Sequence, residues 1–142
     1  MGIRLALIQG GSQIILDNPM FGVGFGDDMD MMVEMMNSTN PEFKCINKSH
    51  FHNQYIQTST QSGLVGLGLL FFFFYTVFKV KIKNVEIRNI KWILLSTFLV
   101  TFIPEPLFGR QFSLALFGLM LGLILAQYRS EQQILIHEGE DQ

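Results

Sequence analysis

The chain has 142 residues, of which 49% are hydrophobic and only 15% are charged, and its formal net charge is −2. A soluble domain of this size carries about 25% charged residues, so the composition favours a membrane protein with a polar first section. The net charge by itself predicts nothing about nucleic acid, but no basic patch is interleaved with aromatic residues, so we do not expect a nucleic-acid-binding protein. The single cysteine, Cys45, cannot form an internal disulfide and has no metal-ligand spacing around it. No cofactor is expected.

The first section, residues 1–61, begins with a weakly amphipathic pattern that predicts a helix over residues 4–16, although two adjacent glycines interrupt it. Asp17-Asn18-Pro19 ends this helix, because the residue before a proline is disfavoured in helical conformation. The next residues, MFGVGFG at 20–26, follow no strand and precede no Gly-Lys-Ser/Thr motif. We interpret them as a tight loop in which glycines permit close backbone approach, rather than as a phosphate-binding loop.

A cluster of acids and methionines follows the glycine-rich loop. The acids lack the spacing of a calcium-binding loop, and carboxylates favour the positive N-terminal end of a helix, so they predict a helix start. The methionines would pack against neighbouring helices or lipid. The polar residues 37–48, which include Pro41, predict a loop. The acids are Asp27, Asp28, Asp30 and Glu34, and the methionines are Met29, Met31, Met32, Met35 and Met36.

Three apolar segments predict transmembrane helices at residues 62–80, 90–104 and 107–128. The first is the most apolar stretch and has about the 20 residues that a helix needs to cross hydrocarbon. The second is short and has to borrow residues up to Lys91, with the lysine snorkelling and Trp92 at the interface, and it ends at a Pro-Glu-Pro turn.

The third span carries a stripe of small residues, Gly118, Gly122 and Ala126, that allows close packing between membrane helices. Three short helices have too little surface to form a cavity alone. We therefore expect further transmembrane helices as partners, together with membrane lipids.

Charge and parity predict the same orientation in the membrane. The loop at 81–89 is rich in Lys and Arg, which favours the cytoplasmic side. Three crossings put the tail at 129–142 on this side and residues 1–61 on the other. The expected fold is an all-α membrane protein: an extracytoplasmic loop region with short helices, followed by three transmembrane helices.

Four motif pieces, in order, resemble the O-antigen ligase and polymerase family. His52-Asn53 is followed, after nine residues, by Gly63-Leu64-Val65-Gly66 at the mouth of a membrane helix. Upstream, NPMFGVGFG at 18–26 resembles a turn of that family, and Arg4 stands fifteen residues before its proline. Pro104-Glu105-Pro106 before the last membrane helix is similar to the family's C-terminal end. The resemblance covers nearly the whole chain but only the C-terminal part of the family's length, so the missing N-terminal helices would be partners.

The resemblance implies a glycosyltransferase of the GT-C type in the bacterial inner (cytoplasmic) membrane. Such enzymes transfer a glycan, without a metal, from an undecaprenyl-pyrophosphate carrier to lipid A–core sugar or to a growing polysaccharide, on the periplasmic face. The sequence does not separate ligase from polymerase in lipopolysaccharide biosynthesis. As a C-terminal fragment, the 142-residue chain is expected to be inactive by itself; the alternative is a non-catalytic truncated module that binds partner helices or lipid-linked glycan.

The resemblance also implies roles for particular residues. His52 carries over as the general base for the acceptor hydroxyl, since histidine titrates in the right range. Arg4 is the candidate for stabilising the pyrophosphate leaving group, because a guanidinium binds phosphate in a fork geometry. The candidate substrate-binding residues are Asn53, Arg110 and His50, and the structural motif comprises Pro19, Gly22, Gly24, Gly63 and Gly66.

Each candidate also has a plainer interpretation. His52 would be an interfacial histidine bonded to a carbonyl, Arg4 a surface arginine, and His50 a solvent-facing residue with no third metal ligand near it. Arg110 would snorkel, pair with Glu105 or reach the carrier's phosphates. Helical spacing further predicts that four residues share one face of a helix, so that the histidine lies above a cleft lined by small residues. These residues are His52, Ser59, Gly63 and Gly66.

Overall fold

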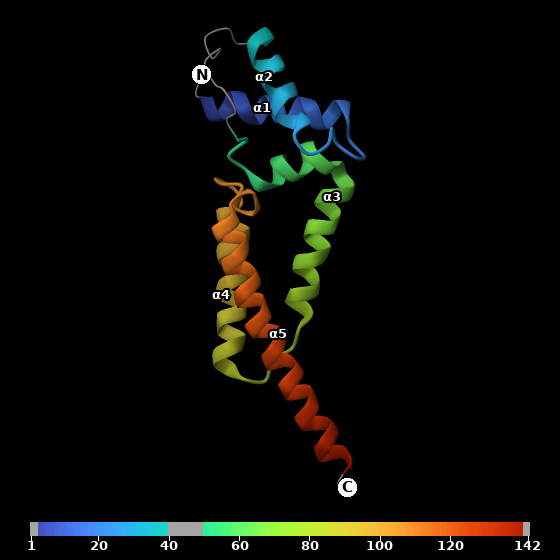
Figure 1. The fold of residues 1–142 in the computed structure, drawn as a ribbon, viewed down its shortest axis with the longest axis vertical. Coiled ribbons are helices and arrows are strands. Elements are labelled where there is room, and N and C mark those ends of the chain that lie inside the picture. Colours follow the sequence, from blue (N-terminus) through green and yellow to red (C-terminus); the bar gives the residue numbers. More distant parts are fainter. Residues whose placement is uncertain (1–2, 40–49, 141–142) are drawn as a thin grey trace. The chain divides into compact units, whose positions relative to one another are not determined.

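The computed structural model describes residues 3–39 and 50–140, and the regular structure in these residues is entirely helical (Figure 1). The expected all-α fold is therefore confirmed for this part of the chain. The helices are α1 (Ile3–Asp17), α2 (Asp27–Thr39), α3 (Gln54–Lys79), α4 (Val85–Thr101), the short 3-10 helix η2 (Leu107–Gly109) and α5 (Gln111–Glu140). The chain forms two compact units, unit 1 (Met1–Phe73 and Thr101–Pro106) and unit 2 (Phe74–Val100 and Leu107–Gln142).

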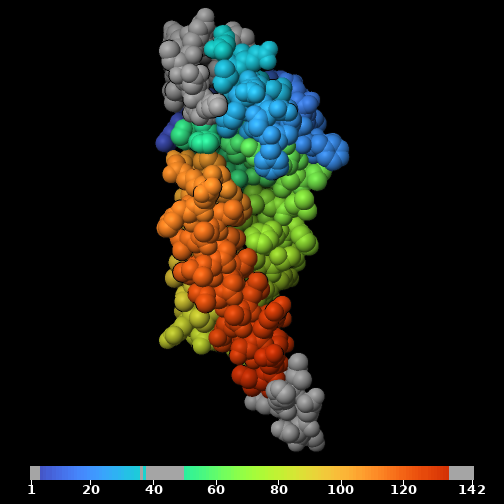
Figure 2. Space-filling view, viewed as in Figure 1, coloured from blue at the N-terminus to red at the C-terminus, as the bar shows by residue number. Residues whose placement is uncertain are grey.

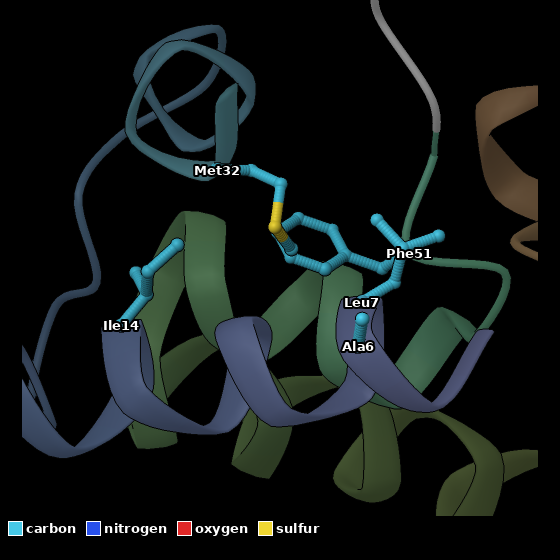
Figure 3. Packing of buried hydrophobic residues seen from close by; sticks show 5 residues of the cluster. All are labelled: Ala6, Leu7, Ile14, Met32 and Phe51. Carbon is cyan, nitrogen blue, oxygen red and sulfur yellow. The ribbon is translucent and has the colours of Figure 1, made fainter. Parts of the chain in front are cut away.

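The core of unit 1 lies between α1, α2 and the residues just before α3. Side chains from these three segments converge in Figure 3, where Met32 of α2 points toward the ring of Phe51. A thioether against an aromatic ring is a favourable contact. In the space-filling view the atoms of α1 and α2 lie next to each other (Figure 2). The buried members of this core are Ala6, Leu7, Ile14, Met32 and Phe51.

The two glycines of α1 do not interrupt the helix, and they let its neighbours come close. A Cβ at Gly11 would lie 2.9 Å from the Phe51 ring, and one at Gly10 would lie 3.0 Å from the sulfur of Met32. Both distances are shorter than ordinary van der Waals contact. Gly10 and Gly11 therefore allow α2 and Phe51 to pack directly on the α1 backbone.

Helix α2 begins where the acids predicted it, with three aspartates in its first turn. It continues through Thr39, so the loop expected over 37–48 is wrong for residues 37–39. Residues 40–48 of the expected loop, which include Cys45, lie outside the described residues.

Unit 2 is held together by a cluster of phenylalanines from the end of α3, from α4, from η2 and from α5. The rings of Phe98 and Phe117 are 4.6 Å apart, and Phe74 and Phe108 lie 5.8 and 5.5 Å from Phe117. These separations are in the range of favourable aromatic pairs. The cluster packs α4 against α5 on their apolar faces.

Lys91 is buried, so the snorkelling predicted for it is wrong. Its side chain is 3% exposed, and Nζ donates hydrogen bonds to the carbonyl oxygens of Val80 (2.7 Å) and Phe78 (3.2 Å). The last carbonyls of a helix have no partner within the helix and carry partial negative charge. Lys91 of α4 thus caps the C-terminal end of α3.

The loop between α3 and α4 is fixed by α5. The carboxylate of Glu131 accepts hydrogen bonds from the backbone N–H groups of Lys83 (2.7 Å) and Asn84 (2.9 Å). Asn84 in turn caps α4, because its side-chain oxygen accepts the N–H of Ile87. Helix α5 continues through Glu140, so it includes most of the residues of the tail expected at 129–142.

Two helices of the described chain, Gln54–Lys79 and Gln111–Ile134, are long and apolar enough to cross a membrane, with mean hydropathies of 1.7 and 1.6. Only 17% and 11% of these segments is buried, whereas the core helix of a soluble protein is mostly buried. The first of these helices begins at Gln54 and is interrupted at Gly63, and the span expected at 62–80 stays a prediction. Helix α4 has 17 residues, and the span expected at 90–104 stays a prediction.

Candidate active site

Helix α3 is broken at Gly63, close to the start of the apolar stretch. The backbone there has φ 64° and ψ −161°, which is outside helical geometry. A break of this kind leaves carbonyl groups before it and N–H groups after it without partners inside the helix. Buried backbone groups of this kind have to find partners elsewhere.

The turn at residues 18–26 supplies these partners. The N–H groups of Val23 and Gly24 donate to the carbonyl oxygens of Thr60 (2.8 Å) and Gln61 (3.0 Å). On the other side of the break, the N–H groups of Leu64 and Val65 donate to the carbonyl oxygens of Pro19 (2.8 Å) and Met20 (3.3 Å). Two motif pieces that are distant in sequence thus form one structure, which we call the turn–break junction (residues 18–26 and 60–66).

Two glycines make the close approach in this junction possible. Gly22 and Gly63 have φ 66° and φ 64°, a region that glycine adopts readily. A Cβ at Gly22 would collide with the carbonyl oxygen of Thr60, and one at Gly63 would collide with that of Met20. One turn beyond the break, a Cβ at Gly66 would collide with the Ser62 side chain.

A buried carboxylate joins α2 to the junction. Asp28 is fully buried, and its Oδ2 accepts hydrogen bonds from Nε2 of Gln57 (2.6 Å) and Nε2 of Gln61 (3.1 Å). The N–H of Gly26 donates to the other oxygen (3.2 Å). Sequence reasoning missed this network because the acids of α2 were explained by the helix dipole. The available signal was a pair of glutamines four residues apart, which share one helical face.

His52 lies immediately before α3, between two anchored residues. Phe51 is buried in the core of unit 1, and the side-chain oxygen of Asn53 accepts the N–H of Ile56 (3.0 Å), which caps α3. His52 itself has φ 52°, an uncommon value for a residue with a side chain. Its Nδ1 lies 3.8 Å from Oε1 of Glu105, and both side chains are about one-third exposed.

The segment that carries Glu105 is bound to the residues around His52. The N–H of Gln54 donates to the carbonyl oxygen of Phe102 (2.8 Å), and Nδ2 of Asn53 donates to that of Ile103 (3.0 Å). Phe102 is fully buried, and its ring meets the ring of Tyr55 edge-on at 5.9 Å. The Pro-Glu-Pro turn and the histidine thus belong to one site within unit 1.

A family model described as O-antigen ligase matches residues 1–73. This match covers just over half of the chain and includes α1, α2, the turn–break junction and His52. The chain belongs to the O-antigen ligase family. No curated protein and no solved structure gave a match to the chain.

In this O-antigen ligase family chain, the predicted residues are divided between the two units. His52, Asn53 and the junction glycines lie within one part of unit 1. His50 is exposed beside Phe51, and Arg4 is exposed in the first turn of α1. Arg110 belongs to unit 2 and is exposed, and its carbonyl accepts the N–H of Leu114 at the start of α5.

The single helical face predicted for His52, Ser59, Gly63 and Gly66 is wrong. His52 precedes the helix, and the break at Gly63 changes the direction of the chain before Gly66. Asn53 uses both side-chain groups in bonds within the chain, so its contact with substrate stays a prediction. Within residues 3–39 and 50–140, no group of three or more His, Cys, Asp or Glu is arranged to hold a metal ion.

Replacing Asp28 with alanine is expected to destabilise this O-antigen ligase family chain by about 2–4 kcal/mol, since it leaves the buried amide of Gln57 and the half-buried amide of Gln61 without this acceptor. The thermal unfolding midpoint of the detergent-solubilised chain measures this loss. Asp30→Ala is the matched control, because Asp30 lies in the same helical turn but is exposed. Equal midpoints for the two variants would show that the carboxylate of Asp28 does not hold the junction.

Proposed function

We propose that the chain takes part in glycan transfer from an undecaprenyl-pyrophosphate carrier to lipid A–core sugar or to a growing polysaccharide. The observation that carries this proposal is an imidazole, that of His52, held at the start of a broken membrane-type helix within the residues matched to the O-antigen ligase family. The catalytic role of His52 is part of the proposal.

The proposed reaction is a displacement at the anomeric carbon of the carried glycan. The acceptor hydroxyl oxygen forms the new bond to this carbon, and the bond to the carrier's pyrophosphate oxygen breaks and leaves its electron pair there. The hydroxyl proton goes to His52. Because Nδ1 is buried and faces Glu105, Nε2 is the nitrogen that accepts the proton.

The leaving group is an anion whose charge grows as the bond breaks. Guanidinium groups bind phosphate oxygens through two parallel hydrogen bonds and stabilise such charge. Arg4, exposed on α1, is proposed for this role, and Arg110 is proposed as a second contact to the carrier. No metal is required for these steps.

The proposed site is the periplasmic face of the bacterial inner membrane, with residues 1–61 outside the cytoplasm. The apolar side chains exposed on α3 and α5 support lipid or further transmembrane helices as their neighbours, since large exposed apolar surfaces have to be covered. In this proposal the helices that the family carries upstream complete the cavity for the glycan.

Deleting the gene tests the proposed function. If the chain acts as a ligase, its loss is expected to leave long polymers on the undecaprenyl carrier and to remove the glycan from lipid A–core. If it acts as a polymerase, its loss is expected to leave single repeat units, in place of long polymers, on lipid A–core. Unchanged glycan transfer without accumulation of carrier-linked glycan would contradict the proposal. If a gene for His52→Ala restored glycan transfer to the deletion strain as fully as the wild-type gene does, the chain would be a non-catalytic module instead.

A further inference from the structure

The carboxylate of Glu105 is placed against the buried nitrogen of His52. The distance between Oε1 of Glu105 and Nδ1 of His52 is 3.8 Å, within the range of an ion pair when the histidine is protonated. Nδ1 is shielded from solvent and has no hydrogen-bond partner in the described structure. A carboxylate beside one imidazole nitrogen orients the ring and stabilises the positive charge that forms when the other nitrogen takes a proton.

The position of Glu105 is fixed by its own segment. The N–H of Glu105 donates to the carbonyl oxygen of Thr101 (3.1 Å), and prolines on both sides of Glu105 restrict the backbone. The same segment is bonded through its carbonyl groups to Asn53 and Gln54, the two residues that follow His52. These hydrogen bonds therefore hold the segment of Glu105 next to the residues that follow His52.

The backbone of His52 supports the same interpretation. Its φ of 52° is in the left-handed region, which residues with a Cβ adopt only rarely. Strained conformations of this kind are found mainly where surrounding structure and function require them. Here the residues on both sides of His52 are anchored, by burial of Phe51 and by the capping bonds of Asn53.

We propose that Glu105 is the positioning residue for His52. Its carboxylate holds Nδ1 on the protein side, directs Nε2 to the acceptor hydroxyl, and balances the charge of the imidazolium after proton transfer. This proposal rests on the proposed function of His52 as the base. Glu105 itself forms no bond to substrate and takes no proton.

The experiment measures kcat and KM for glycan transfer in membrane vesicles. The vesicles are prepared from cells that express the chain from its native genomic locus. The probes are undecaprenyl-pyrophosphate-linked glycan and lipid A–core acceptor. Glu105→Gln is expected to lower kcat about tenfold with KM near the wild-type value, because the general base contributes to the transition state and not to binding. Glu105→Asp, which keeps the charge, is expected to retain more of the rate than Glu105→Gln.

A double variant separates positioning from other roles. In a His52→Ala background, Glu105→Gln is expected to cause no further loss, because Glu105 acts through the imidazole. Glu34→Gln, which neutralises an exposed acid of α2, is the control and should keep the wild-type rate.

Several results would overturn the assignment of Glu105. They are a wild-type kcat for Glu105→Gln, a higher rate for Glu105→Gln than for Glu105→Asp, or an additional loss in the His52→Ala background. A His52→Ala variant with wild-type rate would instead refute the proposed function, so the two failures are distinguishable.

Discussion

Replacing Gly63 with alanine is expected to destabilise unit 1 more than any other single change considered. The backbone of Gly63 is in a region that is essentially accessible to glycine alone, and forcing another residue into it costs about 1–3 kcal/mol. A Cβ there would also collide with the Met20 carbonyl. The collision separates the turn from the helix and breaks hydrogen bonds worth about 0.5–1.5 kcal/mol each, so we expect a total loss of about 4 kcal/mol or more.

The unfolding midpoint in detergent and the rate of proteolysis within residues 18–26 both measure this loss. Gly68→Ala is the matched control in the same helix, because no atom lies within 4 Å of the position where its Cβ would be. It removes a flexible residue from a helix and is expected to change stability by no more than about 1 kcal/mol, in the stabilising direction. If Gly63→Ala behaved like Gly68→Ala, the turn–break junction would not be the structural centre of unit 1.

The sequence is sufficient to predict features that depend on local chemistry. Three aspartates in one turn mark the start of α2, and the residues before Pro19 mark the end of α1. The long apolar segments predict helices in the regions of α3 and α5. In hydrocarbon there is no water to bond to the backbone, so its polar groups have to form hydrogen bonds within a helix.

Features that depend on contacts between distant residues are not predictable in this way. The break at Gly63 is stable because the turn at 18–26 binds its free backbone groups, and nothing within α3 itself specifies that partner. The sequence predicts that Lys91 lies at the membrane surface, whereas its Nζ donates hydrogen bonds to the carbonyl oxygens of Phe78 and Val80. The pairing of His52 with Glu105 joins two motif pieces that the sequence presents separately.

Replacing His52 with alanine is expected to lower glycan transfer by about 10²–10⁴-fold, the range that a general base contributes. The loss should appear in kcat, since the imidazole acts on the proton that leaves the acceptor in the transition state. Glu34→Gln is the control, because Glu34 is an exposed residue of α2 that has no part in the proposed reaction. It is expected to leave the rate unchanged.

The backbone at residue 52 requires a second variant. Alanine in the left-handed region is strained by about 1–2 kcal/mol, whereas glycine adopts φ 52° without strain. His52→Gly therefore removes the imidazole with the backbone conformation preserved. The amount of each variant in the membrane, measured by immunoblot, corrects the rates for loss of folded protein.

The most direct test of His52 as the base is a measurement of glycan transfer from undecaprenyl pyrophosphate to acceptor. The rate with labelled glycan is compared in vesicles that contain equal amounts of wild-type, His52→Ala and His52→Gly protein. Both variants are expected to lose at least 100-fold of the wild-type rate, whereas Glu34→Gln is expected to keep it. A wild-type rate in His52→Gly would contradict the proposed role of His52 as the base, because unit 1 would then hold a histidine that the reaction does not use.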